Sequence, residues 1–142
     1  TETNKQISGS TIERALAAAA LFVFSAGCFF VALFNPVTTH IMPACPMLSI
    51  TGFACPGCGL TRGFHALFHG DIITALDFNA IIPMYVIGFV YGFLALFLFA
   101  VRGKGLPYKR VGPIGLGVFL LVSIIFGVLR NIPEYPFTVL YP

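Results

Sequence analysis

Three long apolar runs dominate the chain, at about Ala15–Phe34, Ala80–Val101 and Gly112–Leu129. Each has roughly twenty residues without an ionised side chain, which is the length that a helix needs to cross a bilayer core of about 30 Å. A buried soluble core is excluded, because 58% of the residues are hydrophobic and only 9% are charged, so too little polar sequence remains to cover it. The first run lacks a small-residue cleavage pattern and is expected to be a helix, not a leader peptide. We therefore predict an all-α membrane protein, one domain over residues 1–142, with three transmembrane helices.

Basic residues predict how these helices are oriented. The connection 102–111 is crowded with lysine and arginine, and the positive-inside rule places such a loop in the cytoplasm. Three crossings then put the N-terminus in the cytoplasm, and the segments 35–79 and 130–142 on the extracytoplasmic side. The basic residues counted inside are Lys5, Arg14, Arg102, Lys104, Lys109 and Arg110, and those outside are Arg62 and Arg130. This topology explains the net charge of +3. The sequence has no basic run interleaved with aromatic residues, which a nucleic-acid-binding face would need, so the charge is no evidence for nucleic-acid binding.

The segment 35–79 is too long for a simple connection between antiparallel helices. Its prolines exclude a continuous helix before Gly57, whereas Gly59–His69 has helical spacing and is followed by Gly70, a natural C-terminal cap. Asp71 is the expected N-cap of a further short helix through Leu76. We therefore expect a short amphipathic or re-entrant helix in this loop. In the tail 130–142, prolines are expected to interrupt regular structure and leave a strap along the outer surface.

Three cysteines lie in this loop, in the pattern Cys45-Pro46 followed by Cys55-Pro56-Gly57-Cys58-Gly59. Two residues between sulfurs suit either a tight disulfide or two ligands of one metal ion, and the spacing alone does not choose. Pairing two of the three would leave one over, which favours a metal or a shuffling pair. Cys28 lies in the first apolar run and is expected to act as a small hydrophobic residue.

A polar stripe follows the second of these cysteines. It consists of Cys58, Arg62, His65 and His69. The successive spacings are four, three and four residues, so the side chains would share one face of a helix. A helix N-terminus and a nearby arginine both stabilise a thiolate, and histidines at i and i+4 can bind one metal ion. The candidate metal ligands are therefore Cys45, Cys55, Cys58 and one of His65 or His69, with zinc or copper as the ion. The alternative is that both histidines are interfacial residues of an amphipathic helix and Arg62 reaches towards head groups.

Arg130 closes the third apolar run on the same side as the cysteines. A charge at this depth is costly unless it is paired or reaches the interface. The outward carboxylates are Asp71, Asp77 and Glu134. We expect at least one of them to pair with Arg62 or Arg130 and so tie the loop to the helices.

These residues carry a family resemblance. They are Cys45-Pro46, Gly52, Cys55-Pro56-Gly57-Cys58-Gly59-Leu60-Thr61-Arg62, Leu67, Gly70-Asp71, Ala75 to Asn79, and Arg130-Asn131-Ile132-Pro133 after the last run. In this pattern the chain resembles the bacterial membrane family called domain of unknown function 2752. Asn79-Ala80 departs from the expected Asn-Pro. The resemblance implies a bacterial inner-membrane location and supports Arg62, Asp71, Arg130 and Asn131 as structural residues, but the family name carries no activity.

Three functions remain open, and a non-enzymatic one is favoured. The first is an accessory protein or subunit of a larger membrane complex, which presents a loop stabilised by a metal or a disulfide; the glycines of the helices offer surfaces for neighbouring subunits. The second is a thiol-disulfide oxidoreductase using Cys55 and Cys58, with Cys45 as resolving thiol and Arg62 lowering a thiolate pKa. The third is a zinc- or copper-binding membrane protein.

Overall fold

The computed structural model describes residues 10–36, 38–39, 45–104 and 111–140, and every regular element in them is helical. In chain order the elements are α1 (Thr11–Leu33), α2 (Pro46–Thr51), α3 (Leu60–Phe68), α4 (Ile72–Phe78), α5 (Ile82–Arg102), α6 (Val111–Leu129) and the 3₁₀ helix η1 (Phe137–Leu140). Helices α1, α5 and α6 are long and apolar enough to cross a membrane, which confirms the predicted fold class. The chain is a multi-pass membrane protein.

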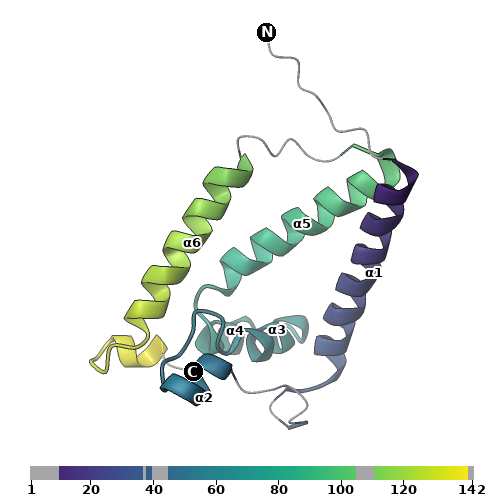
Figure 1. The fold of residues 1–142 in the computed structure, drawn as a ribbon. Helices are drawn as coiled ribbons and strands as arrows, with labels where there is room; N and C mark the ends of the chain where they lie inside the picture. The colour runs from purple at the N-terminus through teal and green to yellow at the C-terminus, as the bar shows by residue number, and fades with distance from the viewer. Residues whose placement is uncertain (1–9, 37, 40–44, 105–110, 141–142) are drawn as a thin grey trace.

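The described elements outside the long helices lie at one end of these helices. The start of α1, the end of α5 and the start of α6 lie at one end, and α2, α3, α4 and η1 lie at the other (Figure 1). The helix ends that the basic connection joins and the described part of the Cys-rich loop therefore lie at opposite ends of the helices, as three crossings require. Which end faces the cytoplasm stays a prediction from the basic residues.

Helix α1 begins at a capping box and packs against α5. The backbone N–H of Ser10 donates to the Glu13 carboxylate at 2.8 Å, and the Ser10 hydroxyl accepts from the Glu13 N–H at 3.3 Å, which satisfies two groups that the first turn leaves open. Arg14 donates to the carbonyls of Ala100 and Val101, at 3.0 and 2.8 Å. These are C-terminal carbonyls of α5 that have no partner within their own helix. Arg14 therefore joins the first turn of α1 to the last turn of α5.

Helices α3 and α4 form a tight hairpin across the other end of α1 and α5. The Asp71 carboxylate accepts from the N–H of Thr74 at 3.0 Å, so Asp71 is the N-cap of α4 as predicted, and α4 ends two residues beyond the predicted Leu76. The buried side chains of Ala66, Ala75 and Ile82 form the small core between α3, α4 and the start of α5. A Cβ at Gly63 would collide with the Ile82 side chain and come within 3.0 Å of the carbonyl oxygen of Ala75, so the glycine lets α3 pack closely against α4 and the start of α5.

Two short elements were not expected from the sequence. Helix α2 begins at Pro46, because proline is tolerated in the first turn of a helix, where its missing N–H has no partner to lose. The tail contains η1, so the prediction that prolines would exclude regular structure there was wrong over four residues. α2 is short because Pro46 opens it and Gly52, with φ at +75°, closes it, and Pro136 directly precedes η1.

Candidate metal centre

The sulfur-bearing segment is a sharp turn between α2 and α3. Within it the N–H of Cys58 donates to the carbonyl of Cys55 at 3.0 Å, and the chain then passes through Gly59 with φ at +82°. A Cβ at Gly59 would be strained at this φ and would collide with the carbonyl oxygen of Phe78. Glycine at position 59 therefore lets the turn lie directly against the end of α4. Cys45 approaches from the other side, as the residue immediately before α2.

The turn brings three sulfur atoms into one compact triangle. Cys55 Sγ lies 3.2 Å from Cys45 Sγ and 3.3 Å from Cys58 Sγ, and all three atoms lie within 4.8 Å of one another. All three residues are free cysteines. A zinc ion bonded tetrahedrally at about 2.3 Å to each sulfur would separate them by about 3.8 Å, so the triangle fits one ion after a small expansion.

The same triangle argues against direct relay of a disulfide through Cys55. Exchange proceeds by attack of a thiolate on a disulfide sulfur, and three sulfurs in a straight row at these spacings would place the outer two about 6.5 Å apart. Cys45 Sγ and Cys58 Sγ lie within 4.8 Å of each other, so the three atoms surround a point and do not form a row.

The three thiols differ in their surroundings. Cys58 is 5% exposed, and burial together with the neighbouring sulfurs raises its pKa to about 12. The N–H of Leu48 donates to Cys45, and this hydrogen bond, aided by the neighbouring thiols, lowers the pKa of Cys45 to about 7. Cys58 also accepts the N–H of Cys55 at 3.2 Å. Metal binding requires the sulfurs as thiolates, and a cation at the centre would offset the cost of burying their negative charge.

Three polar side chains from distant segments hold the backbone of this turn. Asn131, after α6, accepts the N–H of Ala54 at 2.8 Å and donates to its carbonyl at 2.8 Å. Asn79, at the end of α4, donates to the carbonyls of Pro56 and Cys58 at 2.8 and 3.2 Å. We call Asn79, Arg130 and Asn131 the backbone clamp, and none of these hydrogen bonds uses a sulfur atom.

Arg130 is the charged member of the backbone clamp. It is 1% exposed, and its Nη1 donates to the carbonyls of Cys55 and Cys58 at 2.9 and 3.1 Å. The guanidinium also lies 5.0 Å from the ring centroid of Phe126, a cation–π distance. Arg130 thus joins α6 to the sulfur-bearing turn through carbonyl oxygens. The ion pair expected between Arg130 and an outward carboxylate stays a prediction.

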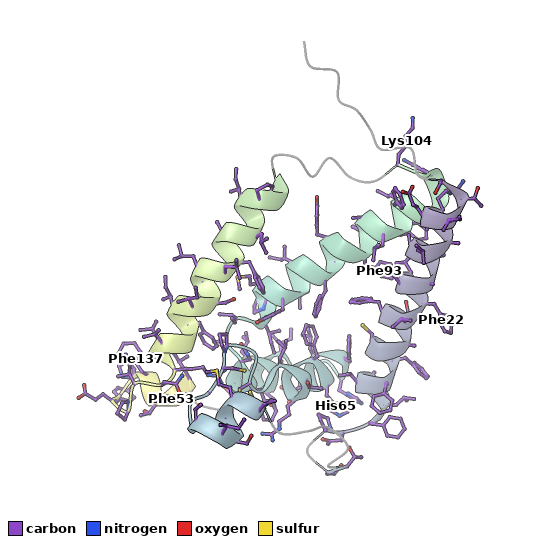
Figure 2. The ribbon with its side chains drawn as sticks, in the orientation of Figure 1. Phe22, Phe53, His65, Phe93, Lys104 and Phe137 are labelled. Atoms are coloured by element: carbon purple, nitrogen blue, oxygen red, sulfur yellow. The ribbon has the colours of Figure 1, made fainter. Side chains whose placement is uncertain are left out.

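The structure does not bring the histidines of the predicted stripe to the sulfurs. His65 Nδ1 lies 2.7 Å from the carbonyl of Val31 on α1, and His69 Nδ1 lies 2.9 Å from the carbonyl of His65. Neither belongs to the group of possible ligands found in the described part of the chain, which consists of the three cysteines. Figure 2 shows His65 on the side of α3 near α1. Arg62 is exposed on α3, and no ion pair joins it to Asp71, Asp77 or Glu134, all of which the structure describes.

Sequence reasoning found the three sulfurs, Arg130 and Asn131, but missed the role of Asn79. Asn79 is 1% exposed, and its side chain bonds both the Cys turn and the N–H of Ile81. The sequence does contain an indication of this role, because an asparagine between a short helix and an apolar run is suited to cap the end of the first and the start of the second.

Comparison with known protein families gives a match to the segment that carries the three sulfurs. Residues 45–101 match the family model described as "Protein of unknown function (DUF2752)", which confirms the family resemblance predicted from the sequence. The matched segment contains the three sulfur-bearing residues and Asn79, and it ends before Arg130 and Asn131. Comparison with curated proteins and with solved structures gives no match.

Proposed function

We propose that this protein is a small membrane accessory protein whose Cys-rich loop binds one soft metal ion on the extracytoplasmic side, through Cys45, Cys55 and Cys58. The triangle of three sulfurs within 4.8 Å carries this proposal. Soft thiolate ligands select zinc or copper(I) over hard oxygen-seeking cations. The bound ion stabilises a loop that is already fixed at its backbone, and the loop is presented to other subunits of a membrane complex.

The hydrogen bonds around the turn support a role in binding. A site that holds its ligands in place before the ion arrives loses little conformational entropy on binding. The backbone clamp holds Ala54 through Cys58 from α4 and α6, and it leaves all three sulfurs available. The loop is therefore suited to bind an ion with little rearrangement.

The test is metal analysis and native mass spectrometry of the protein purified in mild detergent, with four single Cys→Ser variants. Wild type is expected to hold one equivalent of metal per chain, and Cys45→Ser, Cys55→Ser and Cys58→Ser are expected to lose it. Cys28→Ser is the matched control, since Cys28 lies within α1 and outside the sulfur triangle. Metal content that is absent from wild type after loading with zinc and copper(I), or unchanged by the three loop variants, would refute the proposal.

A second candidate is thiol–disulfide exchange, favoured by the 3.2 Å between Cys45 Sγ and Cys55 Sγ. The hydrogen bond from the Leu48 N–H lowers the pKa of Cys45, which favours a thiolate at that residue. The Cys45 thiolate would attack an external disulfide, break its S–S bond and release one of its two thiolates, which leaves a mixed disulfide on Cys45. Cys55, deprotonated by the released thiolate, would then displace the second external thiolate and form a Cys45–Cys55 disulfide, so that the external disulfide is reduced and the two loop thiols are oxidised. Alkylation before and after reduction distinguishes this role from metal binding. Free thiols with bound metal support the metal site, and a loop disulfide that a dithiol reagent readily reduces and re-forms supports exchange.

The role as a subunit rests on the surfaces of the long helices. A Cβ at Gly88, Gly92, Gly115 or Gly117 would meet no atom within 4 Å, so these glycines are not used for packing among the described residues. Small residues allow close approach of neighbouring transmembrane helices. Chemical cross-linking in native membranes tests this part, and a chain that remains a monomer without cross-linked neighbours would overturn it.

A further inference from the structure

Two histidines of α3 stay outside the sulfur triangle and lie against each other. His65 and His69 are one helical turn apart, and their ring centroids lie 4.4 Å apart. His65 is half-buried where α3 meets the end of α1 (Figure 2), and His69 is exposed at the C-terminal end of α3. The pair therefore combines a ring held between two helices with a ring that is open to solvent.

Hydrogen bonds fix the proton of each ring on Nδ1. His65 Nδ1 lies 2.7 Å from the carbonyl oxygen of Val31, and His69 Nδ1 lies 2.9 Å from that of His65. A carbonyl oxygen only accepts, so each Nδ1 is the donor, and in a neutral ring Nε2 then keeps its lone pair. Metal-bound histidines are held in this way, because the ring N–H that faces away from the ion donates to a carbonyl or carboxylate. Both rings therefore have the tautomer and the support of a metal ligand.

The distance between the rings fits one ion bound by both. An ion bonded at about 2.1 Å to two Nε2 atoms lies about 3.2 Å from each ring centroid. The centroids are then about 4.5 Å apart if the two bonds meet at a right angle, and about 5.2 Å apart at a tetrahedral angle. The observed 4.4 Å agrees with the right angle. Tetragonal copper(II) and nickel(II) take right angles, whereas zinc prefers the tetrahedron.

Water would complete the coordination of such an ion. In the part of the chain that the structure describes, the three cysteines are the only group of three or more possible ligands, so no further side chain joins the histidine pair. His69 is exposed, which gives water access to the remaining positions. Imidazole and water suit copper(II) and nickel(II), whereas thiolates select copper(I) and zinc. The histidine pair and the sulfur triangle therefore favour different ions.

We propose that His65 and His69 form a second metal site, which binds one tetragonal divalent ion of the copper(II) or nickel(II) type through both Nε2 atoms and water. This site is separate from the sulfur triangle, and the inference does not depend on metal binding there. Because His65 also donates to Val31, the bound ion fastens the end of α3 to α1.

Isothermal titration calorimetry of the full chain in detergent tests the inference, with nickel(II) iminodiacetate as the probe. This chelate leaves adjacent positions open for two imidazoles, and thiols do not reduce nickel(II) as they reduce copper(II). It is also neutral, so the exposed Arg62 one turn before His65 does not repel it. Wild type is expected to bind the chelate at one site that His69→Gln weakens about ten-fold or more, because the second bond no longer forms within one complex. His40→Gln is the matched control, since it removes the third histidine of the chain, which is not part of α3, and it is expected to bind as wild type does.

His65→Asn tests the other half of the pair. An asparagine amide reaches the position of Nδ1, so this variant keeps a donor for the carbonyl of Val31 and removes Nε2. It is expected to weaken binding as much as His69→Gln does while the melting temperature stays close to that of wild type. If His65→Asn does not fold, His69→Gln decides alone, because its side chain is exposed.

Three results would overturn this assignment. The first is equal affinity of wild type, His65→Asn and His69→Gln for the chelate. The second is a loss of binding in His40→Gln equal to that in His69→Gln. The third is binding that is lost in Cys45→Ser and kept in His69→Gln, which would assign the chelate to the sulfurs.

Discussion

Replacing Asn131 with alanine tests whether the backbone clamp holds the sulfur-bearing turn. The side chain of Asn131 makes two hydrogen bonds with Ala54 and a third, at 2.6 Å, to the carbonyl of Gly127. Ala54 is 0% exposed, so in the variant its N–H and carbonyl would be buried without these partners. A buried polar group that loses its partner costs about 1–3 kcal/mol. Two such groups, partly relaxed, give a local destabilisation of about 3 kcal/mol.

Hydrogen exchange measured by mass spectrometry in detergent micelles is the assay. A loss of about 3 kcal/mol corresponds to roughly 100-fold faster exchange of the amides in 52–60, if exchange follows local opening. Asn131→Asp keeps an acceptor for the Ala54 N–H but no donor, and is expected to fall between wild type and Asn131→Ala. Thr39→Ala is the control, because the exposed Thr39 hydroxyl donates to the carbonyl of Asn35 and not to the turn. Unchanged exchange over 52–60 in Asn131→Ala would refute the conclusion that this residue holds the loop.

Three further predictions follow from single contacts. Gly59→Ala should destabilise the loop by about 2 kcal/mol or more in thermal unfolding, and clearly more than Gly70→Ala. Both glycines have positive φ, but only at Gly59 would the added Cβ meet a carbonyl oxygen. Equal destabilisation by the two variants would contradict this. Hydrogen bonds from Thr74 in the first turn of α4 lower the pKa of Asp71, so the cap is fully stabilising above the ordinary carboxyl pKa and is lost as the pH falls through the lowered value. The protection factors of α4 amides, which divide out the intrinsic pH dependence of exchange, should fall at acid pH in wild type and stay constant in Asp71→Asn; constant protection in wild type would contradict this. Arg14→Gln should lower the melting temperature by a few degrees, because two α5 carbonyls lose a charged donor, whereas a melting temperature equal to that of wild type would contradict the contact.

The fold was largely predictable because the bilayer imposes one length on every crossing helix. The predicted runs Ala15–Phe34, Ala80–Val101 and Gly112–Leu129 became α1, α5 and α6 with ends shifted by a few residues. The two short elements were harder to predict. Six- and four-residue helices bury too little to impose a periodic pattern on the sequence.

The sequence predicted cysteine as the ligand type of the candidate site, but not which of the predicted ligands lie together. Cys-x-x-Cys spacing places two sulfurs together by local geometry alone, and the third had to come from ten residues away through the path of the loop. Helical spacing correctly put His65 and His69 on one face of α3, with ring centroids 4.4 Å apart. It could not reveal that this face lies against the carbonyl of Val31 and away from the sulfurs. Periodicity identifies residues that share a face, whereas tertiary packing decides what covers it.

The site is divided between the family segment and the rest of the chain. Residues 45–101 contain all three sulfurs and Asn79, yet Arg130 and Asn131 supply four of the hydrogen bonds that hold Ala54, Cys55 and Cys58. Gly127 extends this contact, because a Cβ there would come within 3.0 Å of Pro56. The ligands alone therefore do not make the site, since hydrogen bonds from the residues that follow α6 hold the turn in this shape. A fragment ending at residue 101 would keep every thiol and lose the four hydrogen bonds that Arg130 and Asn131 make to the turn.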